Sequence, residues 1–141
     1  MTIRYTTDPT EVAWPELATL FARAPLGPPR APELFERAFD NSALKIFAFD
    51  NDTLVGAGRA LCDGVWRAVL YDVAVLPEYQ GRGIGSAIVR DLIDRAEVPM
   101  VMLYAAPGKE PFYEPFGFRK MKTAMAIMKE PAQRQREGYL E

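Results

Sequence analysis

The sequence contains no histidine among its 141 residues. Histidine is the side chain that most readily changes charge near neutral pH. Its absence therefore removes the commonest general base, the Ser–His and Cys–His nucleophile pairs, and the usual zinc ligands. Any catalysis by this chain has to use carboxylates, tyrosines, lysines, backbone groups or a bound cofactor.

Cysteine, long apolar runs and basic runs are also scarce. The single cysteine, Cys62, cannot form an internal disulfide and suits a reducing compartment, so we expect a cytoplasmic location. No apolar run approaches the ~20 residues that a bilayer span needs, and the N-terminal segment lacks the pattern of a secretory signal. The net charge is −2 without a basic run. We therefore expect neither a membrane nor a nucleic acid as partner.

The composition that remains is that of an ordinary globular protein. Hydrophobic residues make up 49% and charged residues 26% of the chain. This length fits one domain, which we expect to span residues 1–141. The tail, residues 131–141, has no apolar period, so we expect it to be flexible or to contact a partner.

Hydrophobic periodicity predicts a mixture of strands and helices. The expected strands are residues 2–7, 45–50, 54–61, 65–76, 98–105 and 118–129. The expected helices are residues 11–24, 32–39 and 84–96, with a further short helix that ends at Gly117. The second and third strands are predicted to form a hairpin, and residues 65–76 are predicted to be the central strand.

The most unusual stretch is VAVLPEYQGRGIGSAIV, residues 73–89, in which a strand leads through three glycines into a helix. Gly81, Gly83 and Gly85 remove side chains from the turn and allow positive φ angles. Such a turn presents bare N–H groups at the start of the helix, which is how a protein builds an anion site from backbone.

Two common phosphate-binding patterns do not fit this turn. A Walker loop needs lysine and then Ser/Thr after its last glycine, whereas Ser86 and Ala87 follow Gly85 here. A dinucleotide fingerprint needs a small residue at the position of Ile88. A plain tight turn between strand and helix is the remaining simple interpretation, but one glycine normally suffices for it.

A third pattern is specific. The hexapeptide from Gln80 to Gly85 matches Q/R-x-x-G-x-G/A and resembles the acetyl-CoA pyrophosphate loop of the GNAT superfamily of N-acetyltransferases. Downstream, FYEPFGF at residues 112–118 resembles the FYxxxGF segment of that family, at the usual separation. The resemblance covers nearly the whole chain. It implies a mixed α/β (α+β) fold, with a twisted, mostly antiparallel sheet of six to seven strands, a splayed parallel pair, and about four helices on both faces.

The resemblance also implies acetyl-CoA as the acetyl donor, bound without a metal. The N–H groups of the loop and the helix dipole would hold the pyrophosphate, and Arg82 would add a charge-assisted contact. Because the corresponding strand splays from its neighbour in the family, the backbones of Val73 and Val75 are expected to pair with the pantetheine amides. The expected cofactor-binding residues are Val73, Val75, Gln80, Gly81, Arg82, Gly83, Ile84, Gly85 and Ser86.

Tyr113 matches the tyrosine that protonates the departing CoA thiolate in the family. A phenol has a reference pKa of about 10, so it is protonated at neutral pH and can donate to a thiolate. The alternative is that Tyr113 only packs beside Phe112 and Phe116.

The general base is less evident from the sequence. The inward positions Val69 and Tyr71 on the central strand carry neither a carboxylate nor an imidazole. Asp72 is the nearest acid, although alternation along a strand turns it to the face opposite Tyr71. A water positioned by Tyr71 and backbone carbonyls is the other candidate.

The resemblance places the acceptor pocket among the proline-rich loop of residues 25–32, which includes Arg30, the side chains of Trp66 and Tyr71, and parts of residues 121–128. Trp66 and Tyr71 can seat an amine through cation–π attraction, or can simply pack across the sheet. This small, mixed pocket favours a primary amine of a small molecule as acceptor, and the resemblance implies direct transfer to it in a ternary complex.

Two other functions stay open on the sequence alone. A peptide or protein amine is the second choice of acceptor. A non-catalytic module that senses acetyl-CoA also fits, because no base is visible. A homodimer formed through the last strand and the tail is a further expectation.

Overall fold

The computed structural model of the chain describes residues 2–24 and 28–141. It divides into two compact units, residues 1–103 and residues 104–141, which are described separately. The first unit contains β1 (Ile3–Thr6), η1 (Pro9–Glu11), α1 (Trp14–Arg23), α2 (Pro32–Asp40), β2 (Leu44–Asp50), β3 (Thr53–Cys62), β4 (Arg67–Val75), η2 (Pro77–Tyr79), α3 (Ile84–Ala96) and β5 (Met100–Met102). The second contains α4 (Glu110–Tyr113), η3 (Glu114–Phe116) and α5 (Pro131–Arg136).

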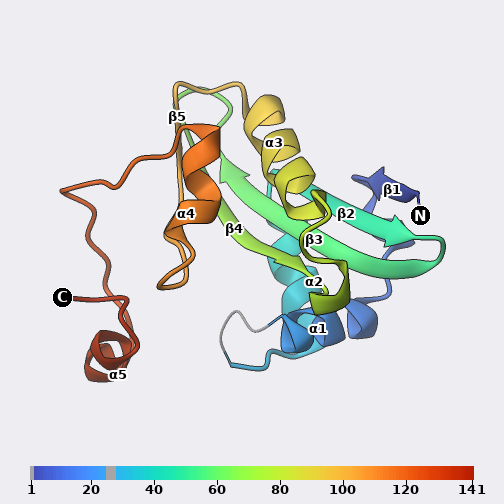
Figure 1. The fold of residues 1–141 in the computed structure, drawn as a ribbon, viewed down its shortest axis with the longest axis horizontal. Coiled ribbons are helices and arrows are strands. Elements are labelled where there is room, and N and C mark those ends of the chain that lie inside the picture. Colours follow the sequence, from blue (N-terminus) through green and yellow to red (C-terminus); the bar gives the residue numbers. More distant parts are fainter. Residues whose placement is uncertain (1, 25–27) are drawn as a thin grey trace. The chain divides into compact units, whose positions relative to one another are not determined.

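The first unit is built on one sheet with the strand order β1-β2-β3-β4-β5 (Figure 1). All neighbours are antiparallel except β4 and β5, which run parallel. The parallel register ends where Val69 faces Met102, whereas β4 continues to Val75. This arrangement confirms the predicted mixed fold with one parallel pair, although the sheet has five strands rather than six or seven.

The helices of the first unit lie on both faces of the sheet, as predicted (Figure 1). Helix α3 contacts β2, β3 and β4. It approaches closely because β3 has glycines there: a Cβ atom on Gly58 would lie 2.6 Å from the γ-methyl of Ile88. On the other face, the ring of Phe47 packs against Phe39 of α2, with centroids 5.5 Å apart, and against Trp14 of α1 at 6.2 Å.

Two predicted strands differ from the structure. The strand expected over residues 98–105 is reduced to Met100–Met102, and the strand expected over residues 118–129 does not form. In the latter segment Met125 is 97% exposed and Ile127 105% exposed. An apolar alternation makes a strand only where a core or a neighbouring strand takes up those side chains. Within this unit nothing covers them.

The tail also has more structure than its sequence pattern indicates. Residues Pro131–Arg136 form α5, with a proline in its first turn and two arginines, Arg134 and Arg136, in its last turn. Proline at the helix start and cations at the helix end are both favourable placements.

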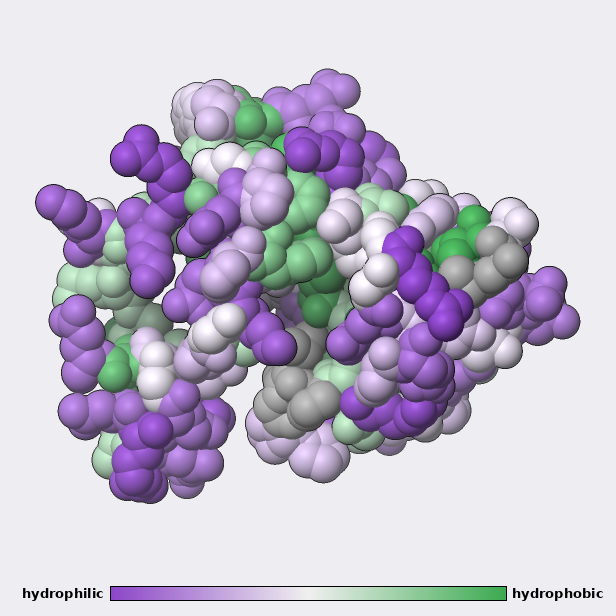
Figure 2. Space-filling model, viewed as in Figure 1, coloured by the Kyte–Doolittle hydropathy of each residue, from purple (hydrophilic) through white to green (hydrophobic). Residues whose placement is uncertain are grey.

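Figure 2 shows a face that is mostly hydrophilic, with hydrophobic side chains in smaller groups. In the described part of the chain, no helix is long and apolar enough to cross a membrane.

The close approach of α3 to β3 leads to a stability prediction. Gly58→Ala should destabilise the protein by about 1–3 kcal/mol, because the added methyl group meets the Ile88 and Leu92 side chains. Urea unfolding of Gly58→Ala, Ile88→Ala and the double variant would measure the coupling. The double variant should lose less than the sum of the two single losses, since Ile88→Ala removes the obstructing group. Strict additivity would contradict this packing.

Candidate functional site

The start of α3 is an open, positively polarised helix end. Gly83 is its N-cap residue, with φ of 84°, and no side chain caps the helix. The first helical backbone bond runs from the Ala87 N–H to the Gly83 carbonyl at 3.0 Å, so the N–H groups of Ile84, Gly85 and Ser86 precede it. A Cβ atom added at Gly81 or Gly83 would meet nothing within 4 Å. The bare backbone and the dipole of this 13-residue helix together suit an anion.

The short helix η2, which leads into the glycine turn, is anchored to the β2–β3 hairpin. The Tyr79 hydroxyl donates to Asp50 Oδ2 at 2.6 Å. This bond is the main reason that the pKa of Tyr79 lies above its ordinary value. The Arg82 guanidinium lies over the Tyr79 ring, 5.2 Å from its centroid, so the expected phosphate-binding arginine has a defined position beside the turn.

Gln80 connects the turn to the end of β4. Its side-chain Nε2 donates to the Val75 carbonyl at 3.0 Å. Both residues are expected to bind the cofactor directly, and this bond joins them to each other. A carbonyl oxygen has two lone pairs, so Val75 can still accept a second bond.

Strand β4 contains a bulge at Asp72. Asp72 has φ of 53°, and the register with β3 shifts between Ala57 and Arg59. A bulge adds an unpaired residue and breaks the alternation of side chains. Arg59 accordingly contacts two consecutive residues of β4. Its guanidinium lies 5.1 Å from the Tyr71 ring centroid, and its Nε donates to Asp72 at 2.8 Å. The expectation that Asp72 faces away from Tyr71 is therefore wrong.

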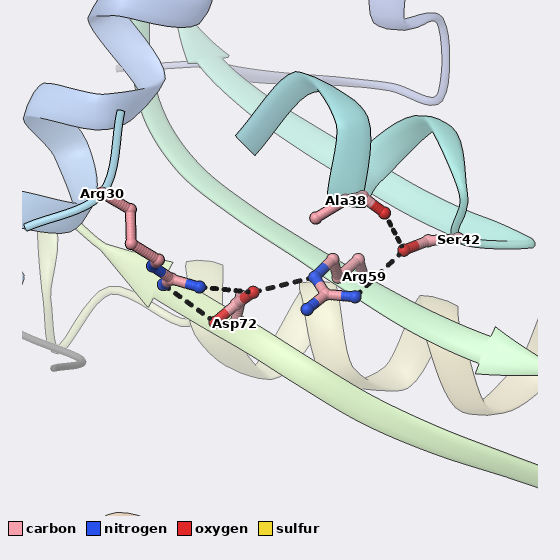
Figure 3. A network of polar contacts seen from close by, with 5 residues as sticks. All are labelled: Arg30, Ala38, Ser42, Arg59 and Asp72. Carbon is pink, nitrogen blue, oxygen red and sulfur yellow. Dashed lines mark hydrogen bonds and ion pairs between the residues drawn. The ribbon is translucent and has the colours of Figure 1, made fainter. Parts of the chain in front are cut away.

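Asp72 is the centre of a polar cluster, which Figure 3 shows. Arg30 donates to both of its carboxylate oxygens, at 3.1 and 3.4 Å, and Arg59 donates to Oδ2. Arg59 also donates from Nη1 to the Ser42 hydroxyl at 3.2 Å, and Ser42 in turn donates to the Ala38 carbonyl at 2.7 Å. The Asp72 side chain is only 12% exposed. Because both oxygens already accept from cations, this geometry favours an anchoring role over that of a general base.

The structure does not bring Trp66 and Tyr71 together. Trp66 is exposed in the turn that precedes β4, whereas Tyr71 lies in the middle of that strand. At about 3.3 Å per residue, their Cα atoms are roughly 16 Å apart along the strand. A shared aromatic seat for an amine is therefore not formed by these two residues.

Tyr113 lies in the second unit, in a cluster of aromatic rings. It contacts Phe112 and Phe118 edge-on, with centroids 4.9 and 5.9 Å away. Burial raises the pKa of the Tyr113 phenol above its ordinary value, so the hydroxyl keeps its proton at neutral pH. The FYEPFGF segment spans the end of α4 and all of η3, and η3 ends at its C-cap residue Gly117, with φ of 100°.

The walls of the expected acceptor pocket are only partly described. Residues 25–27 of the proline-rich loop lie outside the described residues. Arg30, in the same loop, stacks over the Phe35 ring at 4.4 Å. Residues 121–128 have no regular structure.

The sequence patterns did not identify Arg59 and Ser42 as members of the polar cluster around Asp72. For Arg59 the sequence does contain a signal of this role. Arg59 is the one charged residue within LVGAGRAL, the segment predicted to be a strand at residues 54–61, and a charge buried in a sheet needs a partner.

The chain is similar to known acetyltransferases in sequence. The sequence model of the Acetyltransferase (GNAT) family matches residues 12–118. A protein named uncharacterized N-acetyltransferase ycf52-like, from Prochlorococcus marinus, is 37% identical over 91 residues, which are 59% of this chain and 50% of that protein. Serotonin N-acetyltransferase 2, chloroplastic, from Oryza sativa subsp. japonica is 33% identical over 111 residues, 72% of this chain and 54% of that protein. The chain spans about half the length, or less, of the curated relatives it matches.

The fold is similar to that of solved acetyltransferase structures. A protein from meticillin-resistant Staphylococcus aureus, described as a probable acetyltransferase, superposes with a TM-score of 0.78 at 27% identity. The match covers 90% of this chain and 99% of that one. A GNAT family acetyltransferase from Streptococcus pneumoniae gives a TM-score of 0.71 at 26% identity, with coverages of 92% and 98%.

A side chain introduced at the start of α3 tests whether this helix end binds an anion. Gly83→Glu should weaken acetyl-CoA binding by at least about tenfold, because it places a side chain and a negative charge where an anion would bind. Titration calorimetry with acetyl-CoA would measure the loss.

Gly64→Glu is the matched control. Gly64 also has a left-handed φ, 75°, with nothing within 4 Å of an added Cβ, but it lies in the β3–β4 turn. Both variants carry the same backbone strain and charge change, so only the effect on binding should differ. Wild-type affinity in Gly83→Glu would exclude this helix end as the anion site.

Proposed function

Because the chain belongs to the Acetyltransferase (GNAT) family, we propose that it transfers the acetyl group of acetyl-CoA to a primary amine of a small molecule. The observation that carries this proposal is the open start of α3, where Gly83 is left-handed, no side chain caps the helix, and an added Cβ would meet nothing. Backbone N–H groups in that arrangement suit a pyrophosphate without a metal.

Acetyl-CoA supplies the activated acyl group. The N–H groups from Gly81 to Ser86 would hold its pyrophosphate, with Arg82 beside them. The backbones of Val73 and Val75 would pair with its pantetheine amides. The parallel ladder supports this second role, because the described pairing of β5 with β4 ends at Val69, short of both residues.

Tyr113 would act as the general acid. As the amine nitrogen bonds to the acetyl carbon and the carbon–sulfur bond breaks, the Tyr113 hydroxyl gives its proton to the departing sulfur. The raised pKa of Tyr113 supports this role, since the donor must be protonated before transfer. Solvent then returns a proton to the phenolate.

For the amine proton we propose a water near Tyr71 rather than Asp72. Both oxygens of Asp72 accept bonds from arginines, which leaves it poorly placed to receive a substrate proton. Tyr71 is half-buried and its ring is held by Arg59, so its hydroxyl can orient a water.

The first test measures free thiol released from acetyl-CoA across a panel of acceptors. The panel contains small primary amines, a peptide with a free N-terminus, an N-blocked peptide with one lysine, and a blank without acceptor. We expect acceptor-dependent release that is greatest for a small amine. Release only with a peptide would move the acceptor to the second class. Tight acetyl-CoA binding without release for any acceptor would indicate a sensor module.

The general acid is tested by Tyr113→Phe, which keeps the ring and removes the proton donor. We expect kcat to fall by about 10²–10⁴-fold with little change in acetyl-CoA affinity. Tyr139→Phe is the matched control, because Tyr139 is a second tyrosine of the same unit in edge-on contact with another ring, that of Tyr104 at 6.2 Å. Full turnover by Tyr113→Phe would return Tyr113 to a packing role.

A further inference from the structure

The cluster around Asp72 contains more positive than negative charge. Two guanidinium groups, those of Arg30 and Arg59, share the single carboxylate of Asp72 (Figure 3). All three side chains are at least partly buried: Arg59 is 15% exposed and Arg30 34% exposed. A partly desolvated positive charge favours a second anion nearby. The cluster is therefore one negative charge short of balance.

The two arginines are not equivalent. Arg59 is held on several sides, by bonds to Asp72 and Ser42 and by its contacts with the rings of Tyr71 and Phe39. Arg30 is more exposed, and its bonds to Asp72 use two of the five N–H donors of a guanidinium. Arg30 can therefore bind a second anion without releasing Asp72.

The surroundings of Arg30 suit a small, planar anion. Its guanidinium lies over the Phe35 ring, with Cζ 4.4 Å from the centroid, and this contact restricts the positions of its donors. Phe21, Phe35, Pro28 and Pro29 line a cavity of about 30 Å³ beside it. Such a cavity has room for one small group, and its apolar walls strengthen a charge-assisted hydrogen bond made there.

From this geometry we propose that the acceptor carries a carboxylate close to its amine, as an amino acid does, and that Arg30 binds this carboxylate. The inference rests on the proposed acetyl transfer. Asp72 directly precedes Val73, whose backbone is proposed to hold the pantetheine arm, so an anion on Arg30 would keep its amine near the reacting end. The same excess positive charge would repel diamines and other acceptors that carry a second cation.

The test compares acceptors that differ only in this charge. Thiol release is measured for several α-amino acids and their carboxamides, as kcat/KM per neutral amine, so that differences in amine ionisation cancel. The wild type should prefer the free carboxylate by about 10- to 100-fold, the range expected for a charge-assisted bidentate contact. In Arg30→Met the preference should fall to within about threefold, mainly through a higher KM for the amino acid.

Two further variants separate charge from general damage. Arg4→Met is the matched control: Arg4 also pairs with a carboxylate, Glu11, and also stacks on a phenylalanine, Phe49 at 4.8 Å, but at the far edge of the sheet. It should keep the full preference. Arg30→Lys keeps the charge and loses the bidentate geometry, so it should give an intermediate preference.

Several results would overturn the inference. These are equal kcat/KM for acids and carboxamides in the wild type, an unchanged preference in Arg30→Met, or a higher KM for acetyl-CoA alone in that variant. If no amine is acetylated, the proposed function fails, and thermal unfolding then decides the inference separately. The amino acid should raise the Tm of the wild type more than its carboxamide does, and should not raise that of Arg30→Met; equal shifts would refute carboxylate binding.

Discussion

The ion pairs of Asp72 are the interaction on which the site depends. A non-glycine residue with φ of 53° costs free energy, and here two arginines hold the side chain of that residue in place. The bulge at Asp72 changes the direction of the last residues of β4, just beyond Val69, where the pairing with β5 ends. The same contacts connect β3, β4, the end of α2 and the loop before it. Local strain in one strand thus positions both proposed halves of the site.

The arrangement of α3 depends on what β3 lacks. Gly56 and Gly58 have no side chains to hold the helix away, so Ile88 and Leu92 pack directly on the sheet. This close packing brings the start of α3 to the end of β4, with only η2 and the glycine turn between them. Three side-chain contacts from η2 and the turn, made by Glu78, Tyr79 and Gln80, hold the connection. The open helix end is therefore part of a fixed framework.

The parts of the fold that depend on residues close together in the chain could be predicted from the sequence. The three glycines, the central strand and the helix after them were visible because turn residues and periodicity act over a few positions. The anchoring of Asp72 was not visible, since its partners Arg30 and Arg59 lie 42 and 13 residues away. The alternation rule failed there because a bulge needs knowledge of the opposite strand. The apolar run ending in Met125 and Ile127 misled for a similar reason: periodicity does not reveal whether a neighbour exists.

The single bond from Gln80 to Val75 has a consequence for ligand binding. It joins the strand expected to hold the pantetheine arm to the turn expected to hold the pyrophosphate. A ligand that hydrogen-bonds to the Val75 carbonyl would therefore also affect its bond from the Gln80 amide, and through Gln80 the backbone proposed to bind the phosphates. The pantetheine arm and the pyrophosphate of the donor would then bind to two segments that this bond connects, so their binding free energies would be coupled. Separate fragments that carry only one of these groups would bind cooperatively, and their binding free energies would not simply add.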